Sequence, residues 1–322
     1  GVQSTAHSGC SGVKRASYYR GAGLRRRFKR GLYMPIPMRW WAAWSVCLAA
    51  GLTLAGEDAK PLLTPEAPYD PQPLMEKVRA RVNVDRFTFS VLGDARGGAH
   101  FGAILREVEK LNPEFVLTTG DMVSRGAKSK DDWEFLEKVS GPFMRKIPVW
   151  PALGNHEMMG GTEGLGLVTF LSFYGLKRSY YSFEFRHAKF IALSWPLPRK
   201  AELDFLKAEL KAGAESRKLL FVFLHMPFFS AGEKPKEEIP NAPTEITKLF
   251  SAHRVAAVFS GHDHIYYRTV RDGVPYVISA GAGAEIYELK RRGEALPEDS
   301  WYGLDPATNK YVIHAAGGAA QE

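Results

Sequence analysis

Five apolar segments of the chain each end on side chains that can bind a metal ion. In four of them a glycine directly precedes the polar residues, which lets the backbone turn sharply and approach other groups closely. The segments are VLGD, which ends on Asp94; LTTGD, on Asp121; PALGNHE, on Asn155, His156 and Glu157; LLFVFLH, on His225; and VFSGHDH, on His262, Asp263 and His264. Because α/β proteins bind ligands at the carboxyl ends of their strands, we predict that these side chains meet at one edge of the fold.

The types of these side chains favour a site for two metal ions. Carboxylates, an amide oxygen and imidazoles together suit Mn, Fe or Zn rather than a soft thiolate site. His262 and His264 are two residues apart, so on an extended segment both imidazoles point to one side and can reach neighbouring metals. Both cysteines, Cys10 and Cys47, precede all five segments, which leaves no thiolate among the predicted ligands.

The order of the motifs is more informative than any one of them, since a lone Gly-Asp is usually a turn. GD, a second GD 27 residues later, GNHE, His and GHDH follow one another along the chain. This order resembles the pattern D-x-H, GD, GNH(D/E), H, GHxH of the calcineurin-like metallophosphoesterase superfamily, over residues 85 to about 285. GHDHIYYR is also similar to the corresponding stretch of secreted and purple acid phosphatases.

The resemblance implies a fold, a metal centre and a reaction. The fold would be α/β, a four-layer αββα sandwich of two mixed β-sheets flanked by helices. Two divalent or trivalent metal ions (Mn, Fe or Zn) would be bridged by Asp121, with Asp94 and His264 on the first and Asn155, His225 and His262 on the second. His156 would stand near the leaving group as an acid or phosphate contact. A metal-bound hydroxide would attack the phosphorus of a phosphate mono- or diester.

Arg96 stands where the superfamily pattern usually has a metal-binding histidine. An arginine is protonated at every working pH and has no lone pair to offer a metal. Purple acid phosphatases also lack that histidine, but they supply a tyrosine three residues after the second aspartate, where this chain has Ser124. We favour the hypothesis that Arg96 acts in catalysis by binding a substrate phosphate through two N–H groups, beside a metal whose shell water completes.

Two other hypotheses for Arg96 stay open at this point. In one, the first metal is weakly bound or absent, which would leave a mononuclear enzyme. In the other, Arg96 pairs with an acid, and the chain is a catalytically impaired relative that binds a phosphoryl ligand with the same fold. A serine hydrolase or a P-loop NTPase is not supported, because the chain lacks both G-x-S-x-G and G-x-x-x-x-G-K-[ST].

The patterns around the motifs predict an α/β core followed by two hairpins. Strands are expected at 87–93, 113–121, 147–155, 218–225, 255–261 and 309–316, helices at 101–111, 130–146, 199–213 and 244–253, and antiparallel hairpins at 178–195 and 265–283. The glycine-rich segment 158–179 predicts either a mobile flap over the metals or a surface loop with a short helix. Segment 228–243 is a second expected rim of the site.

The N-terminal part of the chain differs from the rest. Before Glu57 there are nine basic residues and no acidic one, and the run Trp40 to Gly56 is apolar and uncharged. We interpret 1–56 as a basic leader with an export signal, 57–84 as a Pro-rich tether with a short helix around Leu74 to Arg81, and 85–322 as the metallophosphoesterase domain. The protein would then be periplasmic or secreted. Alternatively, the apolar run stays as a membrane anchor with the domain facing outside, although 17 residues is short for a span.

Charge argues against nucleic acid as a partner. The chain has 43 basic and 35 acidic residues, a net charge of +8. Without the nine N-terminal basic residues the count is 34 to 35, a net charge of −1. A basic surface along which nucleic acid could bind is therefore not expected on the domain, and a phosphate ester is the expected substrate.

Overall fold

The computed structural model describes residues 60–65, 68–81, 86–194, 200–232, 240, 244–287, 301–302 and 314–315. These residues all belong to one compact unit, Cys47–Glu322, while the other unit, Gly1–Val46, falls outside them. The predicted leader 1–56 and most of the predicted rim 228–243 also lie outside the described residues. Within the described part, no helix is both long and apolar enough to cross a membrane.

The helices and strands alternate through the first half of the domain, as the sequence predicts. Their order is α2 Pro71–Arg81, β1 Phe89–Leu92, α3 Phe101–Leu111, β2 Phe115–Thr118, α4 Lys130–Met144, β3 Val149–Pro151, α5 Asn155–Met158, α6 Glu163–Tyr174, β4 Tyr181–Phe185, β5 Ala188–Ala192, α7 Lys200–Glu215, β6 Leu219–Phe223, α8 Glu245–Ala252, β7 Ala257–Ser260, β8 Tyr266–Arg271, β9 Val274–Ser279, β10 Trp301–Tyr302 and β11 His314–Ala315. Both predicted hairpins form, as β4–β5 and β8–β9. The second turns at Asp272 and Gly273, whose φ angles of 49° and 78° suit a tight two-residue turn.

The strands form two sheets. The smaller has the order β1-β2-β3, and the larger has the order β11-β10-β8-β9-β7-β6-β5-β4. The larger sheet is mixed, with β5, β6, β7 and β9 parallel to one another and β4 and β8 antiparallel to their neighbours. The three described strands of the smaller sheet are all parallel, so it is not mixed in this part of the chain.

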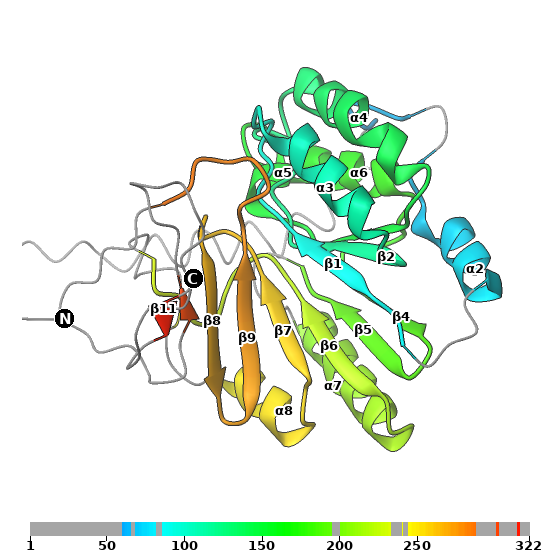
Figure 1. Cartoon of the computed structure of the whole chain (residues 1–322). Helices are drawn as coiled ribbons and strands as arrows, with labels where there is room; N and C mark the ends of the chain where they lie inside the picture. Colours follow the sequence, from blue (N-terminus) through cyan, green and yellow to red (C-terminus); the bar gives the residue numbers. More distant parts are fainter. Residues whose placement is uncertain are drawn as a thin grey trace, which may run out of the picture. The chain divides into compact units, whose positions relative to one another are not determined.

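Alternation of side chains along the strands builds an apolar cluster on each face of each sheet. Between the sheets, Phe115 of β2 meets Phe190 of β5 with ring centroids 5.1 Å apart. The opposite face of the small sheet packs on α3, α4 and α6, and the opposite face of the large sheet packs on α7 and α8. The order helix, sheet, sheet, helix confirms the predicted four-layer α/β sandwich (Figure 1).

Part of the segment predicted as a tether packs on the domain. Tyr69 is buried against the helices, and its hydroxyl donates to Glu137 while accepting from Arg145, at 2.9 Å in both cases. Met75 and Val78 of α2 are buried in the cluster between the sheets. Residues 68–81 therefore add to the core.

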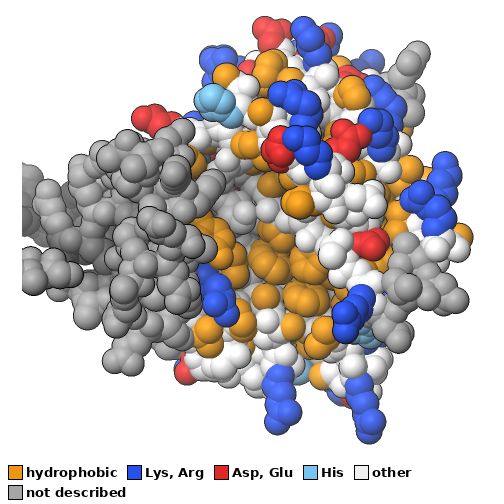
Figure 2. Space-filling view, in the orientation of Figure 1, with side chains coloured by type: hydrophobic (Ala, Val, Ile, Leu, Met, Phe, Trp, Pro, Cys, Tyr) orange, Lys and Arg blue, Asp and Glu red, His pale blue; other side chains and the backbone are white. Residues whose placement is uncertain are grey.

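An apolar hollow opens along the edge of β1 that does not pair with β2. Its cavity of about 360 Å³ is lined by Val91 and Leu92 of β1, by Ile104 and Val108 of α3, and by residues of β8, β9 and the segment that follows. Figure 2 shows hydrophobic side chains gathered in the middle of this face.

In the segment 158–179 the structure shows the predicted helix, packed on the domain. Most of the segment is helix α6, whose Phe170, Phe173 and Tyr174 are buried against α4 and the small sheet. The helix also approaches the backbone of the site closely, because a Cβ on Gly166 would overlap the carbonyl oxygen of Glu157. The glycines of this segment therefore permit close packing of α6 beside the site.

Candidate metal centre

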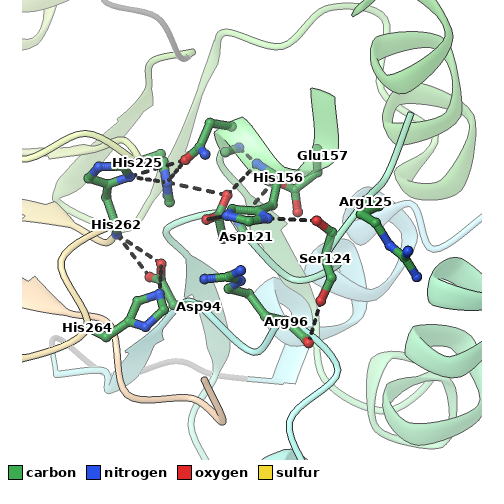
Figure 3. Close-up of polar contacts among 12 residues, drawn as sticks. Asp94, Arg96, Asp121, Ser124, Arg125, His156, Glu157, His225, His262 and His264 are labelled. Atoms are coloured by element: carbon green, nitrogen blue, oxygen red, sulfur yellow. Dashed lines mark hydrogen bonds and ion pairs between the residues drawn. The ribbon is translucent and has the colours of Figure 1, made fainter. Parts of the chain in front are cut away.

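The predicted side chains come together at the carboxyl ends of strands from both sheets (Figure 3). Asp94, Asp121 and Asn155 follow β1, β2 and β3, while His225 follows β6, and His262 and His264 follow β7. Asp94, Asp121 and His262 all have left-handed backbones, with φ angles of 62°, 54° and 70°. Such φ angles are uncommon outside glycine, and here they turn the chain sharply enough to aim each side chain at the same place.

Four of the predicted ligands converge on one point. Asn155 Oδ1 lies 2.8 Å from His225 Nε2 and 3.1 Å from His262 Nδ1, and the two imidazole nitrogens are 3.2 Å apart. Asp121 Oδ1 is 3.3 Å from His225 Nε2. Ligand atoms of Asp121, His225 and His262 all lie within 4.8 Å of one another. These are the bridging residue and the complete set of the predicted second metal.

The donor set fits a metal ion. His225 Nδ1 lies 2.8 Å from the carbonyl oxygen of Thr119, which can only accept, so in the neutral ring Nδ1 carries the proton and Nε2 presents its lone pair to the site. That lone pair faces the acceptor oxygen of Asn155. A cation between these atoms would satisfy acceptors that otherwise face one another. A backbone carbonyl on the outer imidazole nitrogen is also the usual support of a metal-binding histidine.

Buried carboxylates make the same point attractive to positive charge. Burial by itself lowers the pKa of His225, but Asp121 and then Asp94 and Glu157 raise it to about 9. Burial raises the pKa of Asp121, yet the charge and hydrogen bond of His225 outweigh it and lower the value to about 2. Burial and then the neighbouring His225 lower the pKa of His262 to about 3. The site thus favours a positive charge between Asp121 and His225, which a metal ion would supply.

The predicted first metal has fewer side chains. His264 Nε2 lies 3.5 Å from Asp94 Oδ1, and His264 Nδ1 donates to the carbonyl oxygen of Glu285 over 2.7 Å. The His262 amide donates to both oxygens of Asp94, at 3.0 and 3.1 Å. Neither Ser124 nor His100 completes this set. Ser124 donates its hydroxyl to the Arg96 carbonyl over 2.7 Å, and His100 is exposed at the start of α3.

Arg96 and His156 lie beside the metal ligands. The guanidinium of Arg96 points toward the space between Asp94 and Asp121, and no described acid forms an ion pair with it (Figure 3). The amide of His156 donates to Asp121 Oδ1 over 2.8 Å, and its Nδ1 lies 2.7 Å from the Ser124 carbonyl oxygen. His156 Nε2 then faces Asp121 Oδ2 at 3.7 Å. Both side chains are therefore placed to meet a ligand bound at the metals.

Glu157 supports the site, although we assigned it no role from sequence. Its buried carboxylate accepts hydrogen bonds from the amides of Asp121, Met122 and Gly154, at 2.9, 2.8 and 2.8 Å. Burial and then the Asp121 charge raise the pKa of Glu157 to about 7. Glu157 thus links the motif GD at Asp121 to its own motif, GNHE. Its place in GNHE is the sequence signal that could have predicted this role.

A second supporting element is the segment GAGAEIY, 281–287, after β9; its first three residues end the predicted hairpin 265–283, but no role in the site was predicted for it. The amides of Ala282 and Ala284 donate to the carbonyl oxygens of Gly93 and Asp94, both over 2.9 Å. Tyr287 stacks on His264, with ring centroids 4.3 Å apart and planes at 19°. The segment therefore supports Asp94 and His264, two of the three predicted side-chain ligands of the first metal.

Comparison with known proteins agrees with the chemistry that the geometry of the site indicates. A model of the family described as calcineurin-like phosphoesterase matches residues 87–266, more than half of the chain. The chain belongs to the calcineurin-like phosphoesterase family. Membership of this family supports a metal-dependent phosphoric ester hydrolase.

Several relatives of this phosphoesterase are acid phosphatases. Tartrate-resistant acid phosphatase type 5 of Sus scrofa is 26% identical over 241 residues, which cover 63% of this chain and 68% of that protein. Purple acid phosphatase 18 of Arabidopsis thaliana is 26% identical over 201 residues, 57% of this chain and 45% of that protein. The solved purple acid phosphatase PPD1 of yellow lupin seeds has a TM-score of 0.54 at 16% identity, over 68% of this chain and 49% of its own, and it shows the fold.

The chain thus spans about two thirds of the Sus scrofa protein and about half or less of the two plant proteins. Likeness to purple acid phosphatases implies a binuclear metal centre. The group of Asp121, His225 and His262 is consistent with it.

Proposed function

We propose that this phosphoesterase hydrolyses phosphate mono- or diesters with two metal ions held at the carboxyl ends of its strands. The observation that carries the proposal is the convergence of Asp121, Asn155, His225 and His262 on one point, with Arg96 and His156 beside it. Asp121, Asn155, His225 and His262 would hold the second metal, and Asp94, Asp121 and His264 the first. The ligand types suit Mn, Fe or Zn. The bound ions would supply an activated water and positive charge opposite the phosphoryl oxygens.

The remaining side chains would bind the phosphoryl group and move one proton. The guanidinium of Arg96, which forms no ion pair with an acid among the described residues, can hold two phosphoryl oxygens through its fork of N–H groups. As the bond from water oxygen to phosphorus forms, the bond to the leaving oxygen breaks. Because Nδ1 donates to the Ser124 carbonyl, His156 carries a proton on Nε2 only as the imidazolium cation, and this second proton would pass to the leaving oxygen, which leaves the neutral ring. The hydrogen bond of its Nδ1 to the Ser124 carbonyl keeps the ring oriented for this transfer.

A second candidate function is binding of a phosphoryl ligand without turnover. One observation favours it. Arg96 stands where the superfamily pattern has a histidine ligand of the first metal, and Ser124 stands where purple acid phosphatases have a tyrosine ligand. The Ser124 hydroxyl is engaged with the Arg96 backbone, so it does not replace the lost ligand.

One experiment separates the two functions. Metal per purified protein is measured by mass spectrometry, and hydrolysis of p-nitrophenyl phosphate and bis-p-nitrophenyl phosphate is followed after supplementation with Mn, Fe or Zn. We expect two metals per chain and hydrolysis of at least one ester. In His225→Ala we expect both the bound metal and the hydrolysis to be lost. One metal with activity would contradict the two-metal mechanism. Bound metal with no hydrolysis of either ester would favour the binding function.

We also propose export, on the basic leader and apolar run within 1–56. N-terminal sequencing of protein recovered outside the producing cells should find the apolar run removed. Protein that stays with membranes until detergent is added would instead support the anchored form. Recovery inside the cell with the run intact would contradict both.

A further inference from the structure

Asp263 lies between two predicted metal ligands, His262 and His264, but does not face the metals. It is 1% exposed. Its carboxylate oxygen Oδ2 accepts the hydroxyl proton of Ser230, and the Ser230 oxygen in turn accepts the amide of Gly232 over 3.1 Å. The carboxylate is therefore directed away from the site, into the loop that follows His225.

The loop is fitted closely around this carboxylate. A Cβ on Gly232 would overlap both oxygens of Asp263, so only glycine allows the backbone to pass there. The other oxygen, Oδ1, is buried and has no hydrogen-bond partner within the described part of the chain. Burying a carboxylate is costly, which makes a purely incidental role for Asp263 unfavourable.

The contact joins the two loops that carry the histidines of the second metal. His225 follows β6, His262 follows β7, and these strands are parallel neighbours with Phe223 opposite Phe259. Backbone bonds from Gly261 N to His225 O, 2.9 Å, and from Leu224 N to Phe259 O, 3.1 Å, link the loops at their start. Beyond that point the Asp263–Ser230 hydrogen bond ties them together. Ser230 comes five residues after His225, and Asp263 directly follows His262.

We propose that Asp263 and Ser230 are a positioning pair, which fixes the spacing between His225 and His262 and thereby the affinity of the second metal. The inference rests on the proposed metal centre. Without the hydrogen bond, the loop after β6 is released from the loop after β7, and the nitrogens now 3.2 Å apart are no longer held together. Partners that orient metal ligands in this way typically change metal affinity by about 10- to 100-fold when removed.

The test compares Ser230→Ala, Asp263→Ala and the conservative Asp263→Asn, whose amide oxygen can still accept from Ser230. Ser251→Ala is the matched control, because the Ser251 hydroxyl also makes one hydrogen bond between two elements, from α8 to the Asp272 carbonyl in the β8–β9 turn over 2.9 Å, away from the site. The dissociation constant for Zn²⁺ is measured by competition with a chelator. The visible spectrum of the Co²⁺-loaded protein reports ligand geometry, and urea unfolding of the metal-free protein reports stability.

We expect Ser230→Ala and Asp263→Ala to raise the Zn²⁺ dissociation constant by about 10- to 100-fold and to alter the Co²⁺ spectrum. Asp263→Asn should keep most of the affinity, and metal-free Ser230→Ala should unfold at the same urea concentration as Ser251→Ala. An unchanged dissociation constant in Ser230→Ala overturns the inference, as does a loss that only follows a loss of stability. If the unsubstituted protein binds no metal, the proposed function fails first, and the inference fails with it.

Discussion

Arg96 is the residue at which this chain departs from the ligand pattern of its family, and its guanidinium is aimed at the site without an acidic partner in the described residues. If it binds a phosphoryl group, Arg96→Ala should raise KM by about 10- to 100-fold, since a hydrogen bond to a charged group contributes about 1.5–3 kcal/mol. Metal per protein should stay unchanged, because arginine is not a ligand. Steady-state kinetics and metal analysis on the same preparation check both.

Arg125 provides the matched control for Arg96. It lies on the same side of the site as Arg96, but its side chain points away from the metal ligands (Figure 3). Its guanidinium nitrogen Nη2 is 3.9 Å from Asp132 Oδ1. Arg125→Ala should therefore leave KM within about twofold, as expected of an exposed ion pair worth about 0–1 kcal/mol. Equal effects of the two substitutions would mean that Arg96 acts only through the general charge of the site.

His156 is placed to give a proton to the leaving oxygen, and this role depends on the leaving group. Replacement by asparagine, His156→Asn, should lower kcat for an alkyl phosphate by about 10²- to 10⁴-fold, the usual contribution of a general acid. For p-nitrophenyl phosphate the loss should be much smaller, because its leaving oxygen needs little protonation. Rates on the two esters measure this difference. A uniform loss on both would instead assign His156 to phosphate binding.

At the scale of the elements, α6 is held against the site by close backbone contacts. A Cβ on Gly166 would meet the Glu157 carbonyl oxygen, so Gly166→Ala must push α6 and α5 apart. We expect a loss of about 1–3 kcal/mol in the free energy of unfolding, typical of overpacking. Urea denaturation measures it.

Gly102 in α3 is the control for that substitution. A Cβ there would make only an ordinary 3.5 Å contact with Val139. Gly102→Ala should therefore be neutral or stabilise the protein by up to about 1 kcal/mol through the better helix propensity of alanine. A destabilised Gly102→Ala together with a neutral Gly166→Ala would show that packing of α6 on Glu157 does not matter.

These elements also show what the sequence could and could not predict. The sheets were predictable because apolar alternation and polar strand ends coincide, as at Asp94 and Asp121. The role of segment 158–179 was not settled, since its glycines are compatible with mobility and with close packing. Only the position of the Glu157 backbone decides between them. The role of the segment Gly281–Glu285 in the site escaped prediction because it acts through backbone groups, which leave no signal in the side chains.

At the scale of the whole molecule, the candidate metal centre joins the two sheets. Asp94, Asp121 and Asn155 follow strands of the smaller sheet, and His225, His262 and His264 follow strands of the larger one. A ligand that binds only the folded protein stabilises it by RT ln(1 + [L]/Kd). Metal removal should therefore weaken the fold as a whole.

Chelation should accordingly lower the free energy of unfolding by about 3–4 kcal/mol when free metal was 100 to 1,000 times its dissociation constant. Unfolding should remain one transition, because the aromatic cluster between the sheets, with Phe115 against Phe190, still couples them without metal. Urea denaturation followed by the fluorescence of the buried Trp133 and Trp150 measures this with and without EDTA.

The effect of EDTA on stability should largely vanish in His225→Ala, which lacks a predicted ligand of the second metal from the outset. Equal stability of the unsubstituted protein with and without chelator would mean that metal does not hold the sheets together.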